Sequence, residues 1–290
     1  MRWALIYFGV QATAGCIWWV LVFASPWVRA STLASLDPVL VAVVDIPLFV
    51  VASALAALGL RWAAWLATAW TLLVALALAG YATVTAEAGF GVLIMAAAAG
   101  GSLLALSLVA MGRAPTEWIT AGPFAFRPAR GRSHLALTLL QMLLFWGSFL
   151  VVAPLIIAWL EQRWGLRVEV PTAIAGVVLL ALASCLGVWS AVTMAILGKG
   201  TPLPSATANQ LVIAGPYRWV RNPMAVAGIA QGIAVGLLLS SWLVVAYAVI
   251  GSVLWNFAVR PQEEADLERR FGENYRVYRA QVRCWVPRFV

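Results

Sequence analysis

The sequence has few charged residues, one histidine and three cysteines, and each shortage excludes a class of function. Only 10% of its 290 residues are charged, whereas a soluble domain has about 25%, which argues against a soluble fold. A single histidine excludes any mechanism that needs a histidine pair. The cysteines form no CxxC motif and no Cys/His cluster, so we predict no metal site and no disulfide framework.

Apolar residues make up 63% of the chain and recur in long runs. A run of about 20 apolar residues crosses about 30 Å of hydrocarbon as a helix, and the alternating pattern of membrane barrel strands is absent. We therefore predict an all-α polytopic membrane protein with about eight transmembrane helices. The expected spans are residues 3–24, 38–60, 63–84, 89–112, 135–160, 172–197, 224–239 and 242–259.

The distribution of basic residues predicts the orientation of these spans. A cytosolic N-terminus places most arginines on the same side, namely Arg2, Arg61, Arg113, Arg127, Arg130, Arg132, Arg218, Arg221 and the tail from Arg260. Cytoplasmic loops carry such an excess, so both termini are predicted to be cytosolic, in the inner membrane of a bacterial cell. The net charge of +8 is then explained by topology and membrane lipids, and no nucleic-acid partner is expected.

The end of the chain is expected to form a hairpin followed by a surface helix. Residues 224–259 are apolar except around Ser240 and Ser241, which favours a tight helical hairpin that returns the chain to the side of residue 224. The tail beyond is highly charged, but it keeps an apolar stripe at steps of three or four, interrupted near Gly272. This pattern predicts an amphipathic cytosolic helix that lies at the membrane surface or against the ends of the spans. A solvated tail with basic membrane anchors is the alternative. The stripe consists of Leu267, Phe271, Tyr275, Tyr278 and Val282.

Two features of the first half allow more than one interpretation. Asp45 lies inside the second span, two residues before Pro47, and is either a functional intramembrane carboxylate or part of a solvated or Pro-kinked helix end. The segment "ITAGPFAFR" at 119–127 is similar to "VIAGPYRWVR" at 212–221. Shared Gly-Pro turn chemistry explains this likeness more simply than an internal repeat.

Four motifs follow one another in the last third of the chain. They are "GKGTPLP" at 198–204, "LVIAGPYRWVRNPM" at 211–224, "RPQEE" at 260–264 and "FGENYRVYRAQVRCWVP" at 271–287. In this order, on either side of a hairpin, they resemble the C-terminal part of the isoprenylcysteine carboxyl methyltransferase family and its phospholipid methyltransferase relatives. The resemblance covers about residues 198–288. The expected organisation is a four-helix region at 1–112, a basic loop at 113–134 and a methyltransferase-like domain at 135–290, with cofactor motifs at 198–224 and 260–287.

The resemblance implies a membrane enzyme that binds S-adenosylmethionine on the cytosolic side and methylates a lipophilic or small acceptor. It marks Arg260 and Glu264 as the catalytic pair; four residues apart, they share one face of a helix. Glu263 lies about 100° further round that helix, and a solvent-facing Glu263 would contribute much less. The expected cofactor-binding residues are Gly215, Pro216, Tyr217, Arg221, Asn222, Pro223, Glu264 and Tyr275.

The residue types agree with this implied cofactor. Arg221 and the backbone N–H groups after Pro223, at a helix N-terminus, suit the cofactor carboxylate. Asn222 both donates and accepts hydrogen bonds, although it stands where the family usually has histidine. Ala225 replaces the usual aromatic residue. With no histidine in the motif, an anionic acceptor such as a carboxylate or thiolate is favoured, because it needs no base.

Two other classes of protein stay open on the sequence. A membrane reductase of the steroid 5α-reductase type has a related C-terminal helical layout and binds NADPH, but the acidic pair at 263–264 followed by "FGENY" at 271–275 fits the methyltransferase pattern better. A transporter is favoured only by the unassigned first half. The Arg260 and Glu264 pair beside a polar loop argues against it.

Overall fold

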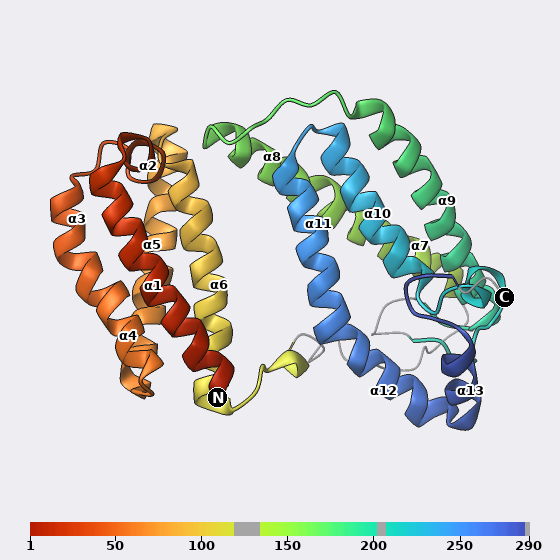
Figure 1. The fold of residues 1–290 in the computed structure, drawn as a ribbon. Helices are drawn as coiled ribbons and strands as arrows, with labels where there is room; N and C mark the ends of the chain where they lie inside the picture. Colours follow the sequence, from red (N-terminus) through yellow and green to blue (C-terminus); the bar gives the residue numbers. More distant parts are fainter. Residues whose placement is uncertain (119–133, 202–206, 288–290) are drawn as a thin grey trace. The chain divides into compact units, whose positions relative to one another are not determined.

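A computed structural model describes residues 1–118, 134–201 and 207–287, and these residues are predominantly helical (Figure 1). The chain divides into two compact units. Unit 1 comprises Met1–Pro115 and Leu160–Arg167, and unit 2 comprises Thr116–Trp159 and Val168–Val290. The prediction of a polytopic all-α membrane protein is confirmed.

Unit 1 is built from long apolar helices with small residues between them. Its helices are α1 (Arg2–Ala24), α2 (Pro26–Thr32), α3 (Pro38–Asp45), η1 (Ile46–Val51), α4 (Ala52–Ala57), α5 (Arg61–Thr85) and α6 (Gly89–Met111). Buried alanines such as Ala63 and Ala67 let the helices approach closely. A buried polar chain crosses this core, because Gln11 donates to Ser53 Oγ at 3.0 Å and accepts from Ser102 Oγ at 2.8 Å.

Asp45 is buried inside unit 1, which excludes the solvated helix end among the alternatives for this residue. Its carboxylate accepts hydrogen bonds from the indole nitrogens of Trp19 at 2.9 Å and Trp70 at 2.7 Å. A π-helical segment, Ile46–Val51, follows directly and includes Pro47. The carboxylate ties together three helices that are separate in sequence, α1, α3 and α5.

Unit 2 contains the hairpin that the sequence predicts. Its described helices are η2 (Thr116–Trp118), α7 (His134–Trp146), η4 (Gly147–Val152), α8 (Ala153–Arg163, the end of which belongs to unit 1), α9 (Ala173–Leu197), η6 (Gly215–Arg218), α10 (Pro223–Leu238), α11 (Trp242–Leu254), η7 (Trp255–Val259), α12 (Arg260–Phe271) and α13 (Glu273–Gln281). A Cβ on Gly176 of α9 would lie 2.9 Å from the backbone nitrogen of Leu238 in α10. The two helices therefore pack in backbone contact at this point.

Seven helical segments in the described part of the chain are long and apolar enough to cross a membrane, against about eight expected. The difference is α10, which has 16 residues and is about 24 Å long. It is followed after a short turn by α11, which Ser241 caps by accepting from the Val244 backbone nitrogen at 3.2 Å. The two helices form the hairpin, so α10 is a short arm rather than a full-length span.

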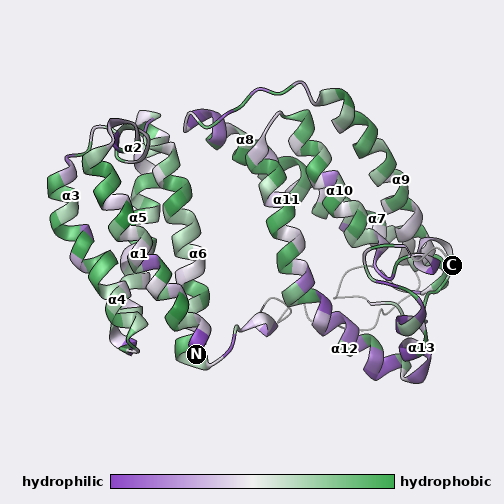
Figure 2. Ribbon diagram, viewed as in Figure 1, coloured by the Kyte–Doolittle hydropathy of each residue, from purple (hydrophilic) through white to green (hydrophobic). Residues whose placement is uncertain are grey.

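The hairpin's second arm continues without a break into the charged part of the chain. The helix Trp242–Phe271 has 30 residues, about 45 Å, and so exceeds the hydrocarbon thickness of about 30 Å. Figure 2 shows the change from the apolar α11 to the hydrophilic α12 and α13. Gly272, with a positive φ of 55°, separates the last two helices. Because α12 carries the charges, we take it to lie beyond the apolar span, which ends at Val259.

Several sequence expectations fall outside the described residues. They are the repeat-like segment at 119–127, most of the basic loop at 113–134, and residues 202–204 of the "GKGTPLP" motif.

Candidate active site

The polar motif at residues 215–224 is built on a short turn that leads into α10. Gly215 adopts a positive φ of 57°, and a Cβ there would lie 3.0 Å from Thr193 Oγ1, so the turn favours glycine. Pro223 is the first residue of α10, where its missing N–H costs nothing. Asn222 caps the helix, because its Oδ1 accepts from the Ala225 backbone nitrogen at 3.0 Å. One of the N–H groups expected to bind a cofactor carboxylate is therefore occupied by this cap.

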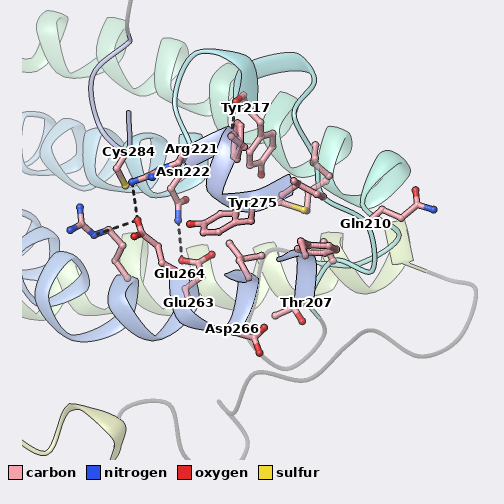
Figure 3. Close-up of a pocket in the computed structure, with 18 of the residues that line it drawn as sticks. Thr207, Gln210, Tyr217, Arg221, Asn222, Glu263, Glu264, Asp266, Tyr275 and Cys284 are labelled. Atoms are coloured by element: carbon pink, nitrogen blue, oxygen red, sulfur yellow. Dashed lines mark hydrogen bonds and ion pairs between the residues drawn. The ribbon is translucent and has the colours of Figure 1, made fainter. Parts of the chain in front are cut away.

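The hairpin brings α12 against this turn and pairs the two sets of charges. Arg221 Nη2 lies 2.9 Å from Glu264 Oε1, and Arg260 Nε lies 3.8 Å from the same oxygen (Figure 3). Asn222 Nδ2 donates to Glu263 Oε2 at 3.2 Å. The cap holds the amide oxygen of Asn222 toward α10, which turns its NH₂ toward Glu263. Glu263 and Glu264 of α12 are thus held by the residues that precede α10.

The last helix closes the site from another side. The Tyr278 hydroxyl donates to the Tyr217 carbonyl at 2.6 Å, and the Arg221 backbone nitrogen donates to the Arg283 carbonyl at 2.9 Å. Tyr275 is 2% exposed and is among the largest buried side chains of the described chain. These bonds fasten α13 and the chain that follows it to the turn that carries Arg221.

A cavity of about 90 Å³ lies between these elements. Charged and aromatic side chains surround it, and Figure 3 shows Tyr275 between the turn and α12. Small-molecule sites are usually about 300–1,000 Å³, so the cavity has to widen before it holds a cofactor. Its lining is Met194, Thr201, Thr207, Ala208, Gln210, Leu211, Val212, Tyr217, Arg221, Asn222, Trp255, Arg260, Glu263, Glu264, Asp266, Leu267, Phe271, Tyr275, Tyr278 and Cys284.

The segment that starts at Thr207 forms a wall of the cavity and is tied to α12 by Arg270. This guanidinium donates to Thr207 Oγ1 at 2.6 Å and to the Ala208 carbonyl. Asp266, one turn earlier, accepts from Arg270 at 3.4 Å. These bonds hold this wall of the cavity to α12.

Two guanidinium groups retain unused hydrogen-bonding capacity in the site. The Nε atoms of Arg221 and Arg260 are buried and have no hydrogen-bond partner among the described residues. A buried, unpaired donor is costly, and a guanidinium fork matches a carboxylate. The two arginines, both beside Glu264, therefore fit a ligand that carries an anionic group next to a cationic one.

Titratable groups in the site have pKa values displaced mainly by burial. Burial, together with the negative charges of Glu264 and Asp266, raises the pKa of Glu263 to about 7. Burial also raises the pKa of Tyr217, Tyr275 and Tyr278, so these phenols stay neutral hydrogen-bond donors. Glu263 is thus a carboxyl group that changes its charge near neutral pH.

The structure brings most of the residues expected at a cofactor site into one place. Six line the cavity, namely Tyr217, Arg221, Asn222, Arg260, Glu264 and Tyr275. Gly215, Pro216 and Pro223 do not line it, and their positions shape the turn and the start of α10.

Glu263 lines the cavity and is bonded to Asn222, so the condition under which it would contribute much less, a solvent-facing position, is not met. Sequence reasoning also passed over Asp266, Thr207 and Cys284. A helical wheel centred on Glu264 does not distinguish Asp266 as a cavity residue from the other acidic residues of α12. Nothing in the local sequence marks Thr207 or Cys284 as cavity residues.

The fold and the site together define a class of protein, namely a helical membrane protein with a charged cavity at the end of an apolar hairpin. Residues 171–274 match the model of a family described as phospholipid methyltransferase. No curated protein matches the chain. The matched region contains α9, the hairpin and the acidic residues of α12, so the predicted family resemblance of the C-terminal part is confirmed. The match supports a membrane methyltransferase.

Proposed function

We propose that this protein transfers a methyl group from S-adenosylmethionine to a lipophilic or small acceptor at the cytosolic face of the membrane. The observation that carries the proposal is the convergence of Arg221 and Asn222 with Arg260 and Glu264 on one cavity, within the region that matches the methyltransferase family. When bound, S-adenosylmethionine supplies an activated methyl group on a sulfonium.

The chain's own residues supply binding, orientation and exclusion of water. Arg221, whose Nε has no partner among the described residues, suits the donor's carboxylate. Glu264 suits its ammonium, with Arg260 as the neighbouring counter-charge. Tyr275 offers a buried aromatic face beside these charges. Methyl transfer is an in-line displacement, so these tasks of alignment are the main ones. The acceptor favoured by the sequence is anionic, a carboxylate or a thiolate.

Binding of S-adenosylmethionine to the purified full chain tests this proposal. We expect isothermal titration calorimetry to detect S-adenosylmethionine or its demethylated product and to detect no NADPH binding, because the cavity combines separate anionic and cationic groups in a family-matched region. Binding of NADPH with no response to S-adenosylmethionine would transfer the protein to the reductase class. Binding of neither would favour a transporter.

We also propose that both chain termini face the cytosol of a bacterial inner membrane, which places the cavity on that side. The hairpin turn, which contains Ser240, then faces the opposite side. Topology reporters fused at Ser240 and at the C-terminus should therefore give opposite signals. The same signal from both fusions would contradict a hairpin that crosses the membrane.

A further inference from the structure

Glu263 and Glu264 are neighbours in sequence but differ in their surroundings. Glu264 is paired with two guanidinium groups, at 2.9 Å from Arg221 and 3.8 Å from Arg260. Glu263 accepts instead from the neutral amide of Asn222. Two adjacent titratable groups with such different environments are suited to different tasks. The paired carboxylate suits binding, and the other one suits proton transfer.

We propose that Glu263 accepts a proton from the methyl acceptor, so that the acceptor is an amine, a hydroxyl or a thiol rather than a carboxylate. This inference rests on the proposed methyl transfer and narrows its acceptor class. It replaces the sequence-based reason for an anionic acceptor, namely that the motif lacks a base.

The geometry places Glu263 where a base is needed. It lines the cavity together with Arg221 and Glu264, which suit the methyl donor, so an acceptor that enters the cavity would meet its carboxyl group. The hydrogen bond from Asn222 engages Oε2. Oε1 takes no part in that bond and is the atom we assign to the proton transfer. Asn222, whose oxygen is fixed by the α10 cap, is the positioning residue.

The charges around Glu263 explain why its carboxyl group takes up a proton near neutral pH. The negative charges of Glu264 and Asp266, also on α12, disfavour a negative charge on Glu263. Tyr217, in the turn before α10, faces Glu263 as well. Arg221 and Arg260 are paired with Glu264, and Tyr275 of α13 stays neutral. A general base works best when its pKa is near the working pH. Burial raises the pKa of Glu263 to about 7, which meets that requirement.

The step balances without a further reactant. A lone pair on the acceptor nitrogen, oxygen or sulfur forms the new bond to the methyl carbon. The carbon–sulfur bond of the sulfonium breaks, and its electron pair stays on sulfur to leave a neutral thioether. The acceptor's N–H, O–H or S–H bond releases its proton to Glu263 Oε1, from which it passes to solvent.

Glu263→Gln tests the assignment, with Glu273→Gln as the matched control, because Glu273 is exposed and does not line the cavity. The probes are dodecylamine, dodecanol, dodecanethiol and dodecanoic acid, each with tritiated S-adenosylmethionine. We expect the wild type to methylate at least one of the three proton-bearing probes. A general base contributes about 10²–10⁴-fold, so Glu263→Gln should lower that rate about 100-fold or more. Donor affinity by calorimetry should stay within about twofold of the wild type.

The pH dependence and an infrared signal separate a base from a merely structural role. The wild-type rate should fall about tenfold from its plateau to pH 6, because Glu263 is then protonated; Glu263→Gln should lose this acid limb. In the absence of any acceptor, the carboxyl C=O stretch that titrates near pH 7 should disappear in Glu263→Gln and persist in Glu273→Gln.

The outcomes distinguish this inference from the proposed function. Failure of the wild type to bind S-adenosylmethionine would overturn the function itself. Donor binding with transfer to dodecanoic acid alone, or to none of the proton-bearing probes, would overturn the acceptor class and leave donor binding intact. An unchanged rate, acid limb or infrared band in Glu263→Gln would overturn the assignment of Glu263.

Discussion

Glu264→Gln should weaken binding of S-adenosylmethionine by roughly ten- to a hundredfold. The substitution keeps the shape of the side chain but removes the charge that opposes the donor's ammonium, and a charge-assisted hydrogen bond is worth about 1.5–3 kcal/mol. Glu264 is 21% exposed and its partner Arg221 is 13% exposed, so solvent screens this interaction only in part. Calorimetric titration of the purified variants measures the effect.

Glu273→Gln is the matched control for this experiment. This substitution makes the same carboxylate-to-amide change, but on α13. The Glu273 side chain is 73% exposed and, among the contacts of the described chain, pairs only with Arg276 at the surface. We expect donor affinity to stay at the wild-type value in this variant. Equal effects of the two substitutions would show that Glu264 belongs to a solvated helix start rather than to a donor site.

Arg221→Met should have the largest effect, abolishing measurable donor binding and lowering stability. Methionine has a similar length but no charge, so the donor carboxylate loses its guanidinium partner, for an expected loss of roughly a hundredfold or more. It also leaves Glu264 without the contact at 2.9 Å. Removing one partner of a buried pair costs about 3 kcal/mol, the lower end of the range, because a carboxylate is left uncompensated.

Thermal unfolding in detergent, followed by calorimetry, measures the stability part of this prediction. Arg218→Met is the control, because Arg218 is exposed and lies over the ring of Trp219 outside the cavity. The double variant Arg221→Met/Glu264→Gln should regain part of the lost stability, since no unpaired carboxylate remains. A double variant as unstable as the sum of the single ones would show that the ion pair contributes no coupling.

Local features of the site could be predicted from the sequence. Arg260 and Glu264 share a helix face because they are four residues apart, and the structure keeps them 3.8 Å apart. Asn222 before Pro223 signals a helix start, which α10 confirms. The return of Arg260 to the level of Arg221 follows from two apolar segments joined by a short polar turn. Each of these depends on neighbours within a few residues or on the length of a helix.

The inward position of Glu263 could not be predicted in the same way. A helical wheel places Glu263 about 100° from Glu264. If the cleft touched only one side of α12, only one of the two side chains would point into it. The turn before α10 contacts α12 on two sides, however, so that Asn222 reaches Glu263 while Arg221 reaches Glu264. Which side chains meet depends on how two elements about forty residues apart cross, and local sequence does not encode that crossing in a readable form.

The amino-acid sequence by itself determined the helical, membrane-spanning class and the family of the C-terminal part. A chain in hydrocarbon has to satisfy its backbone within each helix, so hydropathy located the apolar helices, although α10 is too short to count as a full-length span. Only the tertiary structure decided the environment of the carboxylates. Asp45 is buried because Trp19 and Trp70 reach it from two other helices. Glu263 has a raised pKa because elements distant in sequence exclude water from it. Charge is a property of a residue, but the free energy of that charge depends on everything packed around it.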